Sequence, residues 1–362
     1  MENTKLKKQI LGGILGLAVA DALGVPVEFQ DRESLRRNPV TDMRGYGAHN
    51  QPPGTWSDDT SLTLCLLDSL VKENRFDSEN APERLDYEGI MQRFLSWMDK
   101  AEYTAHNEVF DIGNATRQAL LRFRKGIDPL ECGGTSEQDN GNGSLMRILP
   151  IIFYFPRLYN VLYSHYYAAS YQADCTCFSI VHNVSSLTHA HKRSQIACGI
   201  YFSVAYQLLK SGNRKKLQSA VKYGLKAAKE RYKSGIYKEQ GAFVDELKHY
   251  NRIFRRDFAK LPEEKIESTG YVVDTLEAAL WCLLNTDNYK DCVLKAVNLG
   301  NDTDTVAAVA GGLAGMFYGV DGIPKEWLDQ LARRNYIEKL CEDFYRSLHS
   351  YKGTKGTDTQ QK

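Results

Sequence analysis

The chain has 362 residues, of which 43% are hydrophobic and 25% are charged, and its formal net charge is +1. This composition is ordinary for a globular protein, and the balanced charge gives no support for nucleic acid or an anionic membrane as a partner. The eight cysteines contain no CxxC pair, so neither a disulfide framework nor a cysteine zinc site is indicated. We expect a cytoplasmic monomer with reduced thiols.

The first apolar run, residues 10–20, resembles a secretory signal. It follows Lys5, Lys7 and Lys8 and ends in Ala-Val-Ala, a typical cleavage sequence. Against this interpretation, the run holds three glycines and continues with helical spacing through residues 21–24. We therefore predict an internal helix, and no apolar stretch that reaches the roughly 20 residues needed to span a bilayer.

Most of the remaining sequence has helical periodicity, whereas alternating strand patterns are scarce. The predicted helices cover residues 10–23, 60–72, 88–98, 107–125, 144–154, 160–170, 194–210, 217–232, 271–285, 290–298, 304–318 and 325–348. Residues 226–267 are interpreted as helical surface and a long loop. We predict an all-α fold with a single compact domain over residues 1–350, followed by a polar tail, 351–362, that is disordered.

Two short acidic clusters each stand at the start of a predicted helix. The first is Ser57-Asp58-Asp59-Thr60, and the second is Asn301-Asp302-Thr303-Asp304-Thr305. Taken alone, each is explained as a helix N-terminus, where a capping side chain and acidic residues are favourable. Taken together, the four aspartates with the hydroxyls of residues 57 and 305 supply the oxygen ligands that hard divalent cations prefer. The sequence thus predicts a dinuclear metal site.

Three further features are candidates for substrate or proton chemistry. Glu28 follows a helix end that bears glycine and proline, where a carboxylate can act as general acid or base, although an isolated glutamate is usually a surface residue. Residues 140–147 read Asn-Gly-Asn-Gly-Ser-Leu-Met-Arg, a loop entering a helix, which suits phosphate binding or is simply a capped turn. His189 precedes another predicted helix and is either a substrate contact or a core histidine.

In this order along the chain, these segments resemble the ADP-ribosylglycohydrolase family. The matching stretches run from the glycine-bearing segment 12–24 with Glu28, through Trp56-Ser-Asp-Asp-Thr and the segment 141–150, to Leu187-Thr-His and the acidic cluster 301–305. The resemblance spans residues 10–320 and implies an all-α fold with a dinuclear Mg²⁺ or Mn²⁺ site in a cleft. It assigns the metal-ligand role to Ser57, Asp58, Asp59, Asp302, Asp304 and Thr305. It assigns substrate contacts to Asn140, Gly141, Asn142, Gly143, Ser144 and His189.

The resemblance implies a hydrolase that releases ADP-ribose from an ADP-ribosylated protein or a small ADP-ribosyl substrate. Glu28 or Asp59 would transfer the proton, and the sequence does not choose between them. Two alternatives remain open: a non-catalytic ADP-ribose-binding protein of the same fold, and a dinuclear-metal phosphohydrolase acting on a nucleotide or pyrophosphate. The acceptor is equally open between arginine, serine, O-acetyl-ADP-ribose and nucleic acid ends.

Overall fold

The computed structural model describes residues 2–72, 85–154, 170–211 and 216–349, and these residues form helices without strands. The all-α fold class is therefore confirmed. The predicted tail, 351–362, and all but the last residue of the predicted helix 160–170 lie outside the described residues. The helices are α1 (Glu2–Gly24), α2 (Arg32–Arg37), α3 (Asp58–Lys72), α4 (Tyr87–Lys100), α5 (Asn114–Arg124), α7 (Ser170–Ser186), α8 (Lys192–Ser211), α9 (Leu217–Tyr232), α10 (Gly235–Glu239), α11 (Gly241–Leu247), α12 (Val272–Leu284), α13 (Tyr289–Val297), α14 (Thr303–Tyr318), α15 (Lys325–Gln330) and α16 (Arg334–His349).

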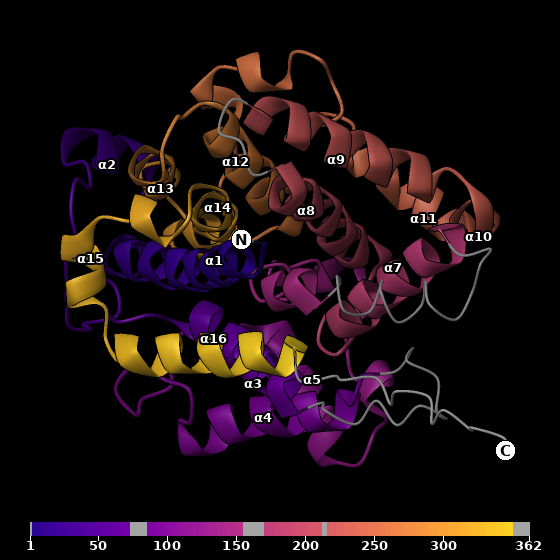
Figure 1. Ribbon diagram of the computed structural model, residues 1–362, viewed down its shortest axis with the longest axis horizontal. Helices are drawn as coiled ribbons and strands as arrows, with labels where there is room; N and C mark the ends of the chain where they lie inside the picture. The colour runs from indigo at the N-terminus through magenta and orange to yellow at the C-terminus, as the bar shows by residue number, and fades with distance from the viewer. Residues whose placement is uncertain (1, 73–84, 155–169, 212–215, 350–362) are drawn as a thin grey trace, which may run out of the picture.

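Helices α1 and α14 lie side by side at the centre of the molecule (Figure 1). Their backbones touch because glycines face one another. A Cβ atom at Gly16 would lie 2.7 Å from the carbonyl oxygen of Gly311, and one at Gly315 would lie 2.1 Å from that of Gly12. Glycine thus permits a separation between the two helix axes that no larger residue allows. These close contacts also fix how the two helices are positioned along each other.

Other helices enclose this central pair on two sides. Helices α3 and α16 pack below it in Figure 1, with α4 packed against α3, and α8, α12 and α13 pack above it. The result is a continuous core in which Leu17, Leu66 and Val306 are fully buried. The end of α1 and the first turns of α3 and α14 consequently meet inside the protein rather than at its surface.

One expectation about α1 was wrong. The segment Lys5–Val27 is long and apolar enough to cross a membrane by length and composition, contrary to the prediction that no such stretch exists. However, 94% of its most apolar window is buried inside the protein, as in the core helix of a globular fold. The hydrophobicity of α1 is explained by its contacts with other helices on all sides.

Several helix boundaries also differ from the prediction. Residues 143–147 form turns and the next helix begins at residue 149, so the glycine-bearing loop does not enter a helix at Ser144. The predicted helix 107–125 is confined to α5, and the predicted helix 325–348 is divided into α15 and α16. Helices α2 and α7 were not predicted.

Candidate active site

A buried carboxylate of α1 holds the start of α3 in place. Asp21 is fully buried and accepts hydrogen bonds from the backbone N–H of Ser57 at 2.9 Å and from that of Thr60 at 3.1 Å. The hydroxyl of Thr60 donates to the same carboxylate at 2.6 Å. Asp21 therefore satisfies amide groups that the first turn of a helix leaves free, and it does so from 36 residues away.

The start of α14 is held against the end of α1. The Thr303 hydroxyl donates to the carbonyl oxygen of Gly24 at 2.8 Å. At Gly24, a Cβ atom would lie 2.3 Å from the Cα of Asp304. These contacts bring the second acidic cluster into van der Waals contact with α1 and thus towards Asp21.

The two acidic clusters meet as the sequence predicts. Carboxylate oxygens of Asp21, Asp59 and Asp304 lie within 4.8 Å of one another, and the same holds for Glu28, Asp302 and Asp304. Asp304 belongs to both groups and links them. Two groups of three carboxylates that share one member have the composition expected of a site for hard cations.

Unpartnered oxygen atoms support the same assignment. Asp59 and Asp304 are fully buried, yet Oδ1 of Asp59 and Oδ2 of Asp304 have no hydrogen-bond partner. A buried carboxylate oxygen without a partner is unfavourable unless a cation compensates its charge. The other oxygen of Asp59 accepts from the hydroxyls of Ser57 at 3.0 Å and Thr305 at 3.1 Å. The residues present therefore fit a bound metal.

Asp58 is placed differently from the other predicted ligands. It is buried beside Asp59, but it belongs to neither group of three closely spaced carboxylates among the described residues. Its pKa is raised well above the usual value, first by burial and then by the charges of Asp111 and Asp59. Burial and these neighbours thus disfavour the ionised form of Asp58 in the absence of a cation, and its role as a ligand remains a prediction.

Burial and mutual repulsion raise the pKa values of the whole cluster. Desolvation is the largest cause for Asp59, followed by the charges of Asp21 and Asp302. Asp304 is raised for the same reason, with Glu28 as its strongest neighbour. The pKa of Asp21 rises to about 6 despite its hydrogen bonds. Ionising these groups together is unfavourable without a cation.

The raised pKa values of these carboxyl groups lead to a prediction of how the stability of the fold depends on pH and on bound metal. A carboxyl group with a raised pKa binds more protons in the folded state than in the unfolded state, so the free energy of unfolding falls as pH rises. The window extends from about 4, the ordinary value of an aspartate, to about 6 for Asp21 and about 8 for Asp111. In EDTA, we expect a lower melting temperature at pH 8 than at pH 5.

Addition of Mg²⁺ or Mn²⁺ should reverse this loss and raise the melting temperature at pH 8 by roughly 5 °C or more when the cation is in large excess over its Kd. The effect should shrink at pH 5, where protons compete with the metal. Differential scanning fluorimetry across this pH range measures both effects. An identical melting temperature with EDTA and with each cation at pH 8 would contradict the metal assignment.

A third group of titratable side chains is formed by Glu28, which was predicted from the sequence, with His49 and Asp111, which were not. The carboxylate of Glu28 is hydrogen-bonded to Nε2 of His49, and ligand atoms of Glu28, His49 and Asp111 lie within 4.8 Å of one another. Burial raises the pKa of Glu28, while the hydrogen bond to His49 partly opposes that rise. Burial and the charge of Glu28 raise the pKa of Asp111 to about 8. Glu28 is thus a buried, oriented acid beside the two clusters.

The loop 140–144 reaches the acidic centre through one side chain. Nδ2 of Asn142 donates to Oδ2 of Asp302 at 2.7 Å and to the hydroxyl of Thr275 at 2.9 Å. The loop is held by backbone hydrogen bonds from Asn142 to Gly270 and from Val272 to Asn140. Asn142 therefore orients one of the predicted metal ligands, a role that its position in the sequence did not indicate.

The other predicted substrate contacts are packed more deeply. A Cβ atom at Gly143 would lie 2.8 Å from the ring of His189, and Gly141 lies against the same ring. His189 is 2% exposed, and burial lowers its pKa to about 3, so the ring is neutral. Ser144 is fully buried and accepts a hydrogen bond from Ser185 at 2.9 Å. The assignment of these residues and Asn140 to substrate binding stays a prediction.

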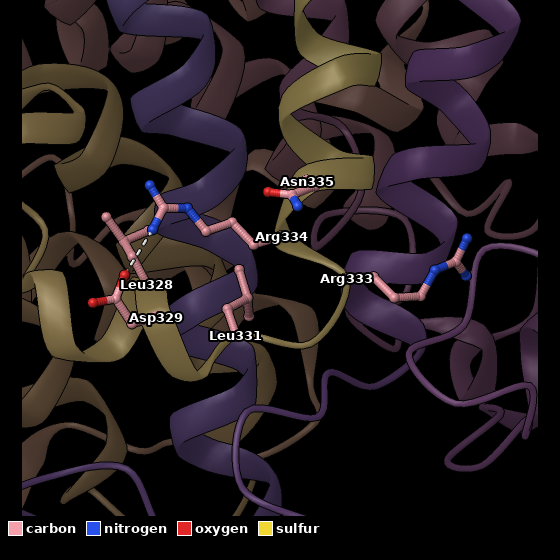
Figure 2. A pocket seen from close by; sticks show the side chains of 6 residues that line it. All are labelled: Leu328, Asp329, Leu331, Arg333, Arg334 and Asn335. Atoms are coloured by element: carbon pink, nitrogen blue, oxygen red, sulfur yellow. Dashed lines mark hydrogen bonds and ion pairs between the residues drawn. The ribbon is translucent and has the colours of Figure 1, made fainter.

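A cavity of about 350 Å³ adjoins the acidic clusters and gives access to them. It is lined by Glu28, Phe29, Thr269, Gly270, Asn301 and Asp302. A second cavity of about 510 Å³ lies at the junction of α15 and α16. Figure 2 shows that its only acidic side chain, Asp329, is paired with Arg334, and that Arg333 points to the opposite side. The first cavity is therefore the candidate active site.

Comparisons with known proteins agree with this geometry. The family model of ADP-ribosylglycohydrolase matches residues 2–353. An ADP-ribosylarginine hydrolase, Tri1, of Pseudomonas putida is 32% identical over 92% of this chain and 77% of its own length. An ADP-ribosyl-[dinitrogen reductase] glycohydrolase of Rhodospirillum rubrum is 30% identical over 91% of this chain and 92% of its own length.

A solved structure described as an ADP-ribosylglycohydrolase-related protein complex superposes with a TM-score of 0.69. The two sequences are 30% identical, and the superposition covers 95% of this chain and 99% of the chain in the solved structure. The helical architecture, the convergent acidic clusters and the match along nearly the whole sequence lead to one conclusion. The chain belongs to the ADP-ribosylglycohydrolase family.

Proposed function

We propose that this protein hydrolyses the glycosidic bond between ADP-ribose and an arginine side chain, with release of intact ADP-ribose. The observation that carries the proposal is the meeting of three acidic groups around Glu28 and Asp304 beside an accessible cavity. The choice of arginine draws on the relatives named as ADP-ribosylarginine hydrolases in Pseudomonas putida and Serratia proteamaculans.

Two divalent cations, Mg²⁺ or Mn²⁺, fit the proposal. Asp59, Asp302 and Asp304 would hold them, together with Asp58 and the hydroxyls of Ser57 and Thr305. When bound, such cations orient substrate hydroxyl groups and lower the pKa of a water molecule. Asn142 keeps the carboxylate of Asp302 in position, and Asp21 keeps the first turn of α3 in position.

Glu28 is better placed than Asp59 to move the proton. Asp59 is fully buried, and one of its oxygens is occupied by two hydroxyl donors. Glu28 lines the cavity, and burial raises its pKa, which favours the protonated form of the carboxyl group. In this mechanism Glu28 exchanges a proton with the attacking water or the departing nitrogen. The surrounding carboxylates stabilise positive charge on the sugar.

The direct test is hydrolysis of purified mono-ADP-ribosyl-arginine and mono-ADP-ribosyl-serine peptides in Mg²⁺, Mn²⁺ or EDTA, with products separated by chromatography. We expect intact ADP-ribose from the arginine peptide, at least tenfold faster than from the serine peptide, and no release in EDTA. AMP or phosphate as the product would identify a phosphohydrolase. Tight binding of ADP-ribose without turnover of either peptide would identify a non-catalytic binding protein.

A further inference from the structure

Phe29, the residue next to Glu28, is a large hydrophobic residue that is exposed to solvent. Its side chain is 70% exposed, although it lines the same cavity as Glu28 and Asp302. The ring of His49, which is hydrogen-bonded to Glu28, has its centroid 5.8 Å from that of Phe29. A large aromatic ring thus stands at the entrance to an acidic site, where its exposure to water is unfavourable.

The backbone at Phe29 is also strained. Its φ angle is +65°, in the left-handed region that an aromatic residue rarely adopts. Asn301, which lines the same cavity, has a φ angle of +62°. The N–H of Phe29 donates to the carbonyl oxygen of Asn301 at 2.7 Å. In return, the N–H of Asn301 donates to the carbonyl oxygen of Gln30, also at 2.7 Å. This pair of hydrogen bonds holds Phe29 in its strained conformation.

The combination of an aromatic face and nearby carboxylates suits a planar cation. A guanidinium group is attracted to the face of an aromatic ring and is weakly hydrated compared with an ammonium group. Glu28 and Asp302 line the cavity, and burial together with the charge of Glu28 raises the pKa of Asp111 close by. The ring of Phe29 and the carboxyl group of Glu28, next to which the bond breaks in the proposed mechanism, thus lie on the wall of one cavity.

The position of the ring distinguishes the acceptor from the adenine end of the substrate. Glu28 is the proposed proton-transfer group, so the bond that breaks lies next to it. The acceptor nitrogen is directly attached to that bond, whereas adenine is separated from it by the distal ribose, two phosphates and a second ribose. Phe29 adjoins Glu28 in sequence and lines the same cavity, so its ring lies on the acceptor side.

We propose that Phe29 is a specificity-determining residue whose ring stacks on the guanidinium group of the acceptor arginine. This inference rests on the proposed function and adds to it the means by which the acceptor is recognised. The strained backbone keeps the ring beside Glu28, and stacking orients the guanidinium before the bond breaks.

The test compares substitutions that separate the ring from the backbone strain. Phe29→Tyr keeps the aromatic face, Phe29→Leu keeps an apolar side chain, and Phe29→Gly relieves the strain and removes the ring. For ADP-ribosyl-arginine peptides, we expect KM within twofold of wild type for F29Y, and about five- to tenfold higher for F29L and F29G. Inhibition by free ADP-ribose should be unchanged in all three variants, because that ligand has no acceptor.

Tyr46 provides a matched control. It is 61% exposed and has a φ angle of +70°, but it does not line this cavity. We expect Tyr46→Gly to leave KM unchanged. Weaker inhibition by ADP-ribose in F29L would instead place the ring on the nucleotide and overturn the inference. Wild-type KM in F29L and F29G would overturn it while leaving the proposed function intact, whereas a wild-type enzyme inactive on ADP-ribosyl-arginine would overturn both.

Discussion

Replacing Asp304 with asparagine is expected to reduce hydrolysis of ADP-ribosyl-arginine by roughly 10³-fold or more while the protein stays folded. Asp304 is the residue shared by two carboxylate groups, and one of its oxygens is buried without a partner. Asparagine has nearly the same shape but lacks the charge. It therefore removes the electrostatic function of Asp304 without creating a cavity in the contact between α1 and α14.

The same substitution should make the metal-free protein more stable. Burial and the charges of Glu28 and Asp59 raise the pKa of Asp304, so removing its charge relieves repulsion in the folded state. In EDTA at pH 8, the melting temperature of D304N should exceed that of wild type, and the further rise produced by Mn²⁺ should be smaller. Asp304→Ala should be equally inactive. Hydrolysis at the wild-type rate in either variant would exclude Asp304 as a metal ligand.

Replacing Gly24 with alanine is expected to be damaging although the two residues differ by one methyl group. The φ and ψ angles of Gly24, −81° and −38°, are helical and acceptable to alanine, so the backbone conformation is not the cause. The added Cβ would lie 2.3 Å from the Cα and 2.4 Å from the N of Asp304. Helix α14 must move, and the metal ligands at its start move with it.

We expect Gly24→Ala to lower the free energy of unfolding by about 3 kcal/mol, at the upper end of the range for overpacking. The rate of hydrolysis should fall by at least 10²-fold, because displacements of about 1 Å disturb catalytic geometry. Chemical denaturation and steady-state kinetics measure the two effects. Gly241→Ala is the matched control, since a Cβ there meets nothing within 4 Å. Equal stability and activity in both variants would show that the contact at Gly24 tolerates a methyl group.

The sequence was sufficient for the fold class and for the two acidic clusters, since helical periodicity and the spacing of the aspartates are local properties. It did not reveal Asp21 as part of the site, because Asp21 lies within an apolar helix and acts on α3 through contacts that only the tertiary structure creates. His49 and Asp111 stand in irregular segments, although the periodicity predicted a helix that included Asp111, and their proximity to Glu28 depends on loop conformation.

The glycine-bearing loop illustrates the opposite case, in which a local pattern suggested too simple a structure. The pattern predicted entry into a helix at Ser144, but residues 143–147 turn instead, and the hydroxyl of Ser144 faces the interior. The glycines serve close packing against His189, which a sequence pattern does not distinguish from phosphate binding. The contact of the loop with the acidic clusters is made by Asn142, whose partner Asp302 is 160 residues away in the sequence.

The pairing of the first long helix with one near the end of the chain has a consequence for biosynthesis. The hydrogen bond between Thr303 and Gly24 joins residues 279 positions apart, so α1 leaves the ribosome long before its principal partner is made. During that interval the long apolar helix α1 lacks the glycine-rich surface of α14 that covers it in the folded protein. Chaperones or the helices made before α14 must then shield its apolar surface from water. The two acidic clusters of the candidate active site come together only when α14 has been made and has packed against α1.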